Sequence, residues 1–212
     1  AVNRTGSGAW SSAAAATPLA TPGAPVDVTA NPGNGRATIT WGVPTDNGGT
    51  RITRYVVQRS ADGGASWVTL ARGTTLTPSQ YAKWLDNGRT YRFRVPARNA
   101  IGRGPWSTPF SVVPRTKASS PRNVVATAGD SSVSLTWSAP SSNGGTAVSA
   151  YLVEQSLDGL NWTTLTDAAD PVTKSYTATL LSNGTAYRFR VSAVTGAGAG
   201  VHSVVRTATP TA

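Results

Sequence analysis

Four arginines on and beside one segment are the side chains of this sequence best placed to bind a charged ligand. Residues 91–95 alternate large apolar with basic side chains, which is the period of a half-buried strand. Arg92, Arg94 and Arg98 are therefore expected on the solvent side of a sheet, with Arg54 contributed by another strand of the same face. Together they form a candidate polyanion-binding patch.

The net charge is distributed unevenly, which favours such a patch. The formal net charge is +10 at pH 7; residues 21–116 hold 12 Lys/Arg against 4 Asp/Glu, whereas residues 117–212 hold 6 against 5. Acidic polysaccharide, a cell-wall polymer such as teichoic acid, and nucleic acid are the ligands considered. Nucleic acid is disfavoured because the aromatic residues are assigned to cores. The alternative is a solvated arginine face that only keeps the protein soluble.

Catalytic and metal-binding chemistry finds little support in the residue types. His202 is the only histidine, and we expect it to face solvent with no nucleophile placed beside it. The nine acidic residues are scattered, without the spacing of paired carboxylates or of a metal site. There is no cysteine, which excludes thiolate nucleophiles and disulfides. We therefore expect no enzymatic activity, no cofactor and no bound metal.

The composition indicates a globular protein rich in strands and turns. Charged residues make up 13% and hydrophobic residues 39% of the chain, with 22 Gly and 14 Pro. No stretch approaches the roughly 18 consecutive apolar residues of a membrane helix. The absence of cysteine leaves the compartment open, because disulfide-free β proteins also occur outside cells.

An internal repeat divides the sequence. Trp41 recurs at Trp137 and Tyr91 at Tyr187, both at an offset of 96 residues. Residues 1–11 resemble residues 97–107 at the same offset. We therefore expect residues 1–20 to hold the last loop and strand of a preceding repeat plus a linker, and 21–116 and 117–212 to be complete domains.

Each repeat contains seven short alternating segments bounded by turn residues, which predicts an all-β fold of two seven-stranded β-sandwiches. Pro96 falls within the strand that begins at Tyr91, where a missing N–H predicts a bulge or a lost ladder bond. Ser192 holds the matching position of the second repeat. Trp84 is matched by Leu180, so packing in a core or an interface is expected for it.

The two repeats resemble fibronectin type III domains of bacterial type. The resemblance rests on motifs spread over each repeat: Trp41, residues 47–49, Tyr55, Trp67, Leu85, residues 91–95 and 104–107, and in the second repeat Trp137, residues 143–145, Tyr151, Trp162, Leu181 and residues 187–191. It implies immunoglobulin-like sandwiches with Trp41 and Trp137 buried at their centres. It also implies that Tyr91 and Tyr187 form tyrosine corners, each hydroxyl bonded to backbone near Leu85 or Leu181.

The same resemblance implies a non-catalytic, extracellular or surface-exposed repeat region that acts as spacer, display or adhesion module. Its expected partners are neighbouring repeats or subunits and acidic polysaccharide or cell-wall polymer, without membrane insertion. Two alternatives remain open at this point. One is an accessory region of a secreted polysaccharide-degrading enzyme, and the other is a surface component of a virion or filament.

Overall fold

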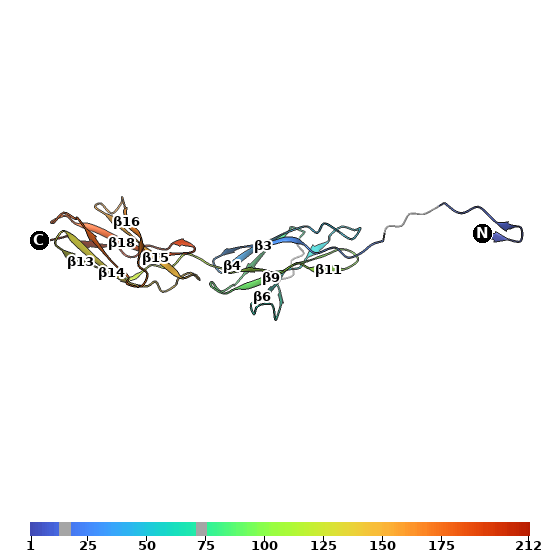
Figure 1. Cartoon of the computed structure of the whole chain (residues 1–212), viewed down its shortest axis with the longest axis horizontal. Coiled ribbons are helices and arrows are strands. Elements are labelled where there is room, and N and C mark those ends of the chain that lie inside the picture. Colours follow the sequence, from blue (N-terminus) through green and yellow to red (C-terminus); the bar gives the residue numbers. More distant parts are fainter. Residues whose placement is uncertain (13–17, 71–75) are drawn as a thin grey trace.

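Two β-sandwiches follow one another along the molecule (Figure 1). The computed structural model describes residues 1–12, 18–70 and 76–212, and every regular element in these ranges is a strand. The part of the chain described therefore has no helix long and apolar enough to cross a membrane. We call the sandwich of β3 to β12 domain 1 and that of β13 to β20 domain 2. The predicted all-β class is confirmed.

Domain 1 has one three-stranded layer and a second layer in two parts. The first layer has the order β3-β4-β8, from β3 (Val26–Gly33), β4 (Arg36–Gly42) and β8 (Ser79–Lys83). The second has the orders β11-β10-β5 and β12-β9-β6-β7. Its strands are β5 (Arg54–Tyr55), β6 (Gln58–Ser60), β7 (Val68–Thr69), β9 (Tyr91–Arg94), β10 (Pro96–Arg98), β11 (Arg103–Trp106) and β12 (Phe110–Val112).

Domain 2 repeats this plan, with longer strands in its second layer only. One layer has the order β13-β14-β17, from β13 (Arg122–Gly129), β14 (Ser132–Ser138) and β17 (Ser175–Thr179). The other has the order β16-β15-β18-β19, with β20 also paired to β18. Its strands are β15 (Val148–Ser156), β16 (Thr163–Ala169), β18 (Tyr187–Thr195), β19 (Gly198–Ala199) and β20 (Arg206–Ala208).

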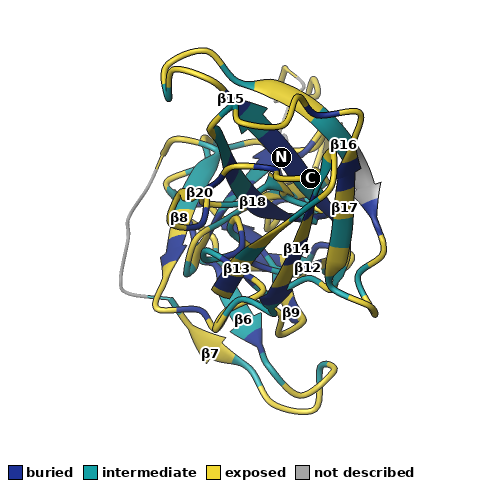
Figure 2. Ribbon diagram, turned by 90° about the vertical axis from the view of Figure 1, so that its left-hand side faces the viewer, coloured by how far each residue is buried: buried dark blue, intermediate teal, exposed yellow. Residues whose placement is uncertain are grey.

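A hydrophobic core lies between the layers of each sandwich, and Figure 2 shows the buried segments inside and the loops exposed. Trp41 and Trp137 are buried at the centres of the two cores, each packed edge-on against a tyrosine at 5.3 Å and 5.2 Å between ring centroids. The alternation of the strands accounts for this, since every second side chain points inward. Trp84 does not join the core: it is 92% exposed, so the core alternative of its predicted packing was wrong, and packing in an interface stays a prediction.

The predicted tyrosine corners are present in both domains. The Asp86 N–H donates to the Tyr91 hydroxyl at 3.0 Å, and the Ser182 N–H donates to the Tyr187 hydroxyl at 3.1 Å. In domain 1 the hydroxyl also donates to the Asp86 carboxylate at 3.2 Å. Each corner fixes the loop that enters its strand, β9 (Tyr91–Arg94) in domain 1 and β18 in domain 2.

Pro96 interrupts its strand, as the sequence predicts. The register between β10 and β11 shifts between Pro96 and Arg98, and β9 ends at Arg94 before β10 begins. In domain 2, Ser192 lies within the uninterrupted strand β18. The facing strand is also split in domain 1, into β5 and β6, but is continuous as β15 in domain 2.

Glycine-rich turns form the joint between the two domains. The Thr116 N–H donates to the Gly144 carbonyl at 2.8 Å, and Gly145 lies against Gly88 so closely that an added Cβ would stand 2.4 Å from the Gly88 nitrogen. The chain entering domain 1 makes the corresponding bond, from the Ala20 N–H to the Gly48 carbonyl at 2.9 Å. The same loop therefore receives the incoming chain in both domains.

A short hairpin of β1 (Val2–Asn3) and β2 (Gly6–Ser7) forms the N-terminal segment. Its register pairs Val2 with Ser7. Residues at the matching positions are paired in both domains, Arg98 with Arg103 and Val194 with Ala199. The hairpin thus has the strand pairing of the last hairpin of each domain.

Candidate polyanion-binding site

Three arginines form a row across the sheet of β11, β10 and β5. Arg98 is the cross-strand partner of Arg54 on one side and of Arg103 on the other. Directly opposite residues share a face of the sheet, with Cβ atoms about 4.5–5.5 Å apart. We call Arg54, Arg98 and Arg103 the arginine row.

The arginine row has no counter-charge among the residues that the structure describes. The ion pairs in those ranges involve Arg89, Arg190 and His202 instead. The Arg54 Nε atom is buried without a hydrogen-bond partner. Like charges directly opposite each other destabilise a sheet, so an anion placed along the row would relieve this repulsion.

Arg94 lies beside the row but is held within the protein. Its guanidinium stacks between the rings of Trp67 and Trp106, at 4.1 Å and 4.2 Å from their centroids. It also donates from Nε and Nη2 to the Gln58 Oε1 atom, at 3.0 Å and 2.7 Å. Burial and the nearby charge of Arg103 lower the pKa of Arg94. Arg94 therefore supports the surface and adds charge to it, but its guanidinium is stacked on two rings and two of its five N–H donors are used.

Arg92 is also engaged elsewhere, since its Nη1 donates to the Gly63 carbonyl at 2.7 Å. Of the four predicted patch residues, the structure pairs Arg54 with Arg98 and leaves Arg92 and Arg94 in contacts of their own. Arg103, which the sequence placed near the loops and outside the four-residue patch, joins Arg54 and Arg98 in the row. Counting outward from the turn at residues 99–102 pairs it with Arg98, so the signal was present.

Domain 2 places small apolar residues where domain 1 has the row. Ala150 pairs with Val194, and Val194 pairs with Ala199, in the same register as the three arginines. The fold accepts alanine, valine and alanine at these positions, so the fold itself does not require the arginines of domain 1.

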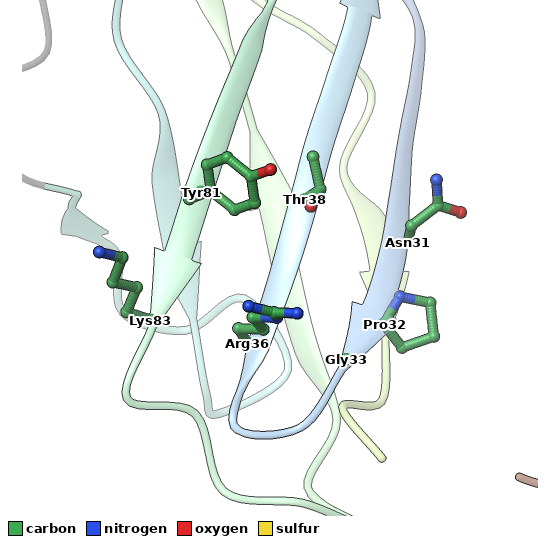
Figure 3. Close-up of a pocket in the computed structure, with 7 residues that line it drawn as sticks. All are labelled: Asn31, Pro32, Gly33, Arg36, Thr38, Tyr81 and Lys83. Carbon is green, nitrogen blue, oxygen red and sulfur yellow. The ribbon is translucent and has the colours of Figure 1, made fainter. Parts of the chain in front are cut away.

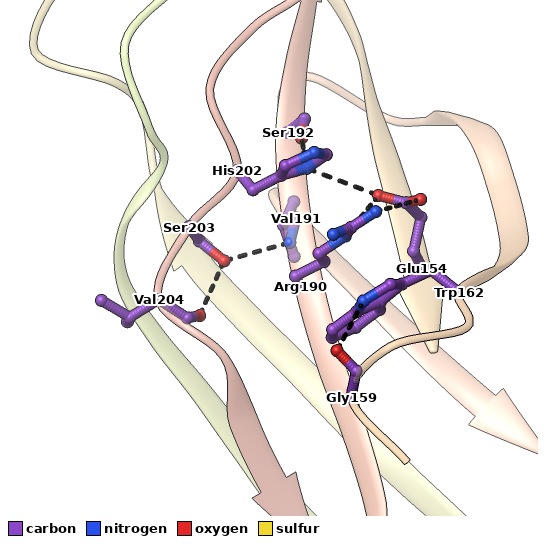
Figure 4. A network of polar contacts seen from close by, with 9 residues as sticks. All are labelled: Glu154, Gly159, Trp162, Arg190, Val191, Ser192, His202, Ser203 and Val204. Atoms are coloured by element: carbon purple, nitrogen blue, oxygen red, sulfur yellow. Dashed lines mark hydrogen bonds and ion pairs between the residues drawn. The ribbon is translucent and has the colours of Figure 1, made fainter. Parts of the chain in front are cut away.

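Arg94 and its counterpart Arg190 are the central arginines of the two domains. In domain 2, Glu154 neutralises the charge of Arg190, as Figure 4 shows. Arg190 donates to both carboxylate oxygens of Glu154, at 2.8 Å and 2.9 Å, and stacks on Trp162 at 4.1 Å. The hydrogen bonds from Arg190 lower the pKa of Glu154 most, with a smaller contribution from the charge of His202. Glu154 holds the position that Gln58 holds in domain 1, so only domain 1 keeps the positive charge of its central arginine.

His202 lies in this network rather than standing alone in solvent. Its Nδ1 atom is 2.7 Å from the Ser192 Oγ atom and 3.4 Å from a Glu154 oxygen, with the side chain 46% exposed. The expectation that no nucleophile lies beside the histidine was therefore wrong. The arrangement is not a hydrolytic triad, because Ser192 and Glu154 approach the same ring nitrogen and Ser192 is fully buried. Across the described ranges, no cluster of side chains is suited to a metal ion.

Sequence comparison agrees with this architecture. The family model described as the fibronectin type III domain matches residues 22–113 and 119–209. The chain belongs to the fibronectin type III family. The predicted tandem of fibronectin type III domains is thereby confirmed.

Relatives of these fibronectin type III domains occur in muscle and in bacterial proteins. The cardiac-type myosin-binding protein C of Gallus gallus is 28% identical over 181 residues, covering 83% of this chain and 14% of that protein. Exoglucanase B of Cellulomonas fimi is 33% identical over 175 residues, covering 76% of this chain and 14% of that protein. A crystal structure of the chicken CNTN1 FN1-FN3 domains aligns with a TM-score of 0.44 at 21% identity, over 90% of this chain and 67% of that one.

The chain spans only about a seventh of each of these two curated relatives. Animal and bacterial proteins both appear among them, so the bacterial-type assignment stays a prediction. The fibronectin type III repeats supply the scaffold, and the arginine row is one of the features that distinguish domain 1 from domain 2.

Proposed function

We propose that this chain is a non-catalytic spacer and adhesion segment of an extracellular or surface-exposed protein, and that domain 1 binds an acidic polymer through the arginine row. One observation carries the proposal: three unpaired arginines stand in register where domain 2 has Ala150, Val194 and Ala199. Acidic polysaccharide and cell-wall polymer fit because their anionic groups repeat along a chain and can lie along a row of cations.

The spacer role rests on the joint between the domains. Backbone groups of the entering chain bond to the glycine-rich loop, and Gly145 packs on the Asn87–Gly88 turn without room for a side chain. We infer that this close backbone packing limits bending between the two sandwiches. A module of this kind carries a binding surface at a fixed distance from its neighbours.

The similarity to Exoglucanase B favours one alternative, an accessory region of a secreted polysaccharide-degrading enzyme. In that setting the same arginine row would hold the enzyme to an acidic substrate or wall polymer. The adhesion segment and the accessory enzyme region would differ in the domains attached to this chain. The chemistry of the arginine row would be the same in both.

Retention on polygalacturonate resin tests the arginine row. In the variant Arg54→Ala/Arg98→Val/Arg103→Ala, domain 1 takes the residues that domain 2 already accommodates. We expect elution at clearly lower salt than for the wild type, because ion contacts to a polyanion are lost with each charge. The variant Arg4→Ala/Arg115→Ala/Lys117→Ala removes the same number of exposed charges outside the row and serves as control. Equal losses in both variants would contradict a specific site.

A further inference from the structure

The opposite layer of domain 1 carries a second surface that differs from its copy in domain 2. On the outer face of β3, β4 and β8, Arg36 is the cross-strand partner of Lys83, and Thr38 is the partner of Tyr81. Asn31 pairs with Thr38 from the other side. Figure 3 shows these side chains on one face, around a shallow groove of about 400 Å³.

Two aromatic rings are exposed along this face. Tyr81 is 59% exposed near the middle of the face, and Trp84 is 92% exposed just beyond the end of β8. Tyr81 and Lys83 line both this groove and a neighbouring one, which Trp84 also lines. The two rings offer exposed apolar surface to a ligand, and covering them would be favourable because it removes that surface from water.

The cations on this face lack acidic partners. Arg36 and Lys83 lie directly opposite each other, a repulsive arrangement in a sheet. None of the ion pairs in the described ranges involves either residue. The face therefore combines a repelling pair of cations with an open aromatic ring between polar side chains.

Domain 2 shows that the sandwich does not need these residues. Ser132 pairs with Thr179 where domain 1 has Arg36 and Lys83, and Ser134 pairs with Thr177 where it has Thr38 and Tyr81. Leu180 replaces Trp84 and, like it, adopts a positive φ, 61° against 58°. The backbone conformation thus belongs to the fold, whereas the cations and the tyrosine are particular to domain 1.

We propose that this face is a second site, which binds an acidic polysaccharide with a sugar ring on Tyr81 and an acidic group between Arg36 and Lys83. The apolar face of a sugar ring packs on an aromatic ring, and a carboxylate accepts strong hydrogen bonds from two cations. Asn31 and Thr38 supply neutral groups for the hydroxyls.

Single-stranded nucleic acid fits this face less well, because such sites track the backbone with a basic groove and several stacking rings. The proposal rests on the adhesive function proposed above and deepens it by adding a second face with an aromatic contact for a sugar ring. Since the arginine row lies in the other layer, one domain would hold two polymer strands on opposite faces.

Binding measurements in a chain without the arginine row separate the two sites. In the Arg54→Ala/Arg98→Val/Arg103→Ala background, we expect polygalacturonate oligomers to bind and their neutral methyl esters to bind at least about tenfold more weakly. Arg36→Ser/Lys83→Thr and Tyr81→Thr, each installing domain 2 residues, are both expected to weaken binding by about tenfold. No binding in this background would overturn the second site and leave the arginine row untouched.

A transfer experiment checks sufficiency. Ser132→Arg/Thr177→Tyr/Thr179→Lys places the three side chains on domain 2, and we expect the number of bound polygalacturonate oligomers per chain to rise. If Arg36→Ser/Lys83→Thr weakens binding but Tyr81→Thr does not, the face binds by nonspecific charge alone, and the proposal is overturned. Tighter binding of single-stranded DNA than of polygalacturonate would also overturn the ligand class.

Discussion

The partner of the central arginine differs between the domains by a single functional group. Arg94 donates to the amide oxygen of Gln58, and Arg190 donates to the carboxylate of Glu154. Both guanidinium groups stack on a tryptophan. The geometry is retained while the net charge of the pair changes from positive to neutral, so the partner decides whether the arginine contributes to the field at the surface.

Replacing Glu154 tests this pair in domain 2. We expect Glu154→Ala to lower the free energy of unfolding by about 3–5 kcal/mol at pH 7, since it leaves a largely buried arginine unpaired. Glu154→Gln is expected to cost less, because Gln58 shows that an amide accepts both bonds. Urea unfolding, followed on domain 2 amides by NMR, measures both values.

The pH dependence of this difference has a defined sign. The folded-state pKa of Glu154 is lowered, so the pair stabilises domain 2 above the unfolded pKa of about 4.3, and the stabilisation is lost as the pH falls through the folded value. The gap between wild type and Glu154→Gln is therefore expected to shrink between pH 7 and pH 3. A gap independent of pH would show that the ion pair contributes no net stability.

The tyrosine corner of domain 1 makes a second prediction at this scale. Tyr91→Phe removes the acceptor of the Asp86 N–H, and we expect a loss of about 1–3 kcal/mol in the free energy of unfolding. Tyr81→Phe, at an exposed position, is the control and is expected to change little. The measurement is urea unfolding followed on domain 1 amides, and a neutral Tyr91→Phe would remove the corner from the account of stability.

At the level of elements, proline accounts for the main difference between the two sandwiches. Strand β18 of domain 2 is continuous, whereas β9 and β10 are separated at Val95 in domain 1. Proline has no N–H for the ladder, so the sheet of domain 1 divides at this point. The arginine row lies just beyond the division, on β10 and its two neighbours.

Ser192→Pro transfers this feature to domain 2. Ser192 is the cross-strand partner of Leu152, so the substitution leaves a ladder acceptor of a buried strand without its donor. We expect a loss of about 1–3 kcal/mol in the free energy of unfolding and faster amide exchange in β15 and β18. Ser192→Ala removes the contact with His202 but keeps the N–H, and so serves as control. Equal effects of the two variants would place the cost in the side chain instead of the ladder.

For the whole molecule, the joint between the domains depends on glycine for two reasons. Gly145 has a φ of 93°, and its position against Gly88 leaves no room for a Cβ atom. The Gly88 N–H donates to the Pro114 carbonyl at 2.9 Å, which ties this turn to the connecting chain. The turn at Gly88, the connecting chain at Pro114 and the loop at Gly145 are therefore packed together at the joint.

Gly145→Ala is expected to open this joint while both sandwiches stay folded. Small-angle X-ray scattering would then show a changed distance distribution between the domains. Gly184→Ala is the matched control, because Gly184 also has a positive φ, 79°, but nothing lies within 4 Å of the added Cβ. An unchanged scattering profile for Gly145→Ala would contradict a restrained joint and with it the spacer role.

Much of this architecture was predictable from the sequence because it depends on local pattern. The 96-residue repeat, the alternation of residues 91–95 and the turn residues predicted two sandwiches, and the resemblance to fibronectin type III domains implied the tyrosine corners. Pro96 predicted the interruption of its strand. These features follow from side-chain period and backbone chemistry, which act within a few residues.

The sequence by itself determined the fold, the repeat and the excess of positive charge in the first repeat. Only the tertiary structure decided which charges meet: it joined Arg103 to Arg54 and Arg98, enclosed Arg94 between two tryptophans, and placed Arg36 opposite Lys83. The physical reason is that contacts between strands depend on pairing and register over long separations. The composition gives the number of charged side chains. The register of the strands decides whether each charged side chain is paired, stacked on a ring or accessible to a ligand.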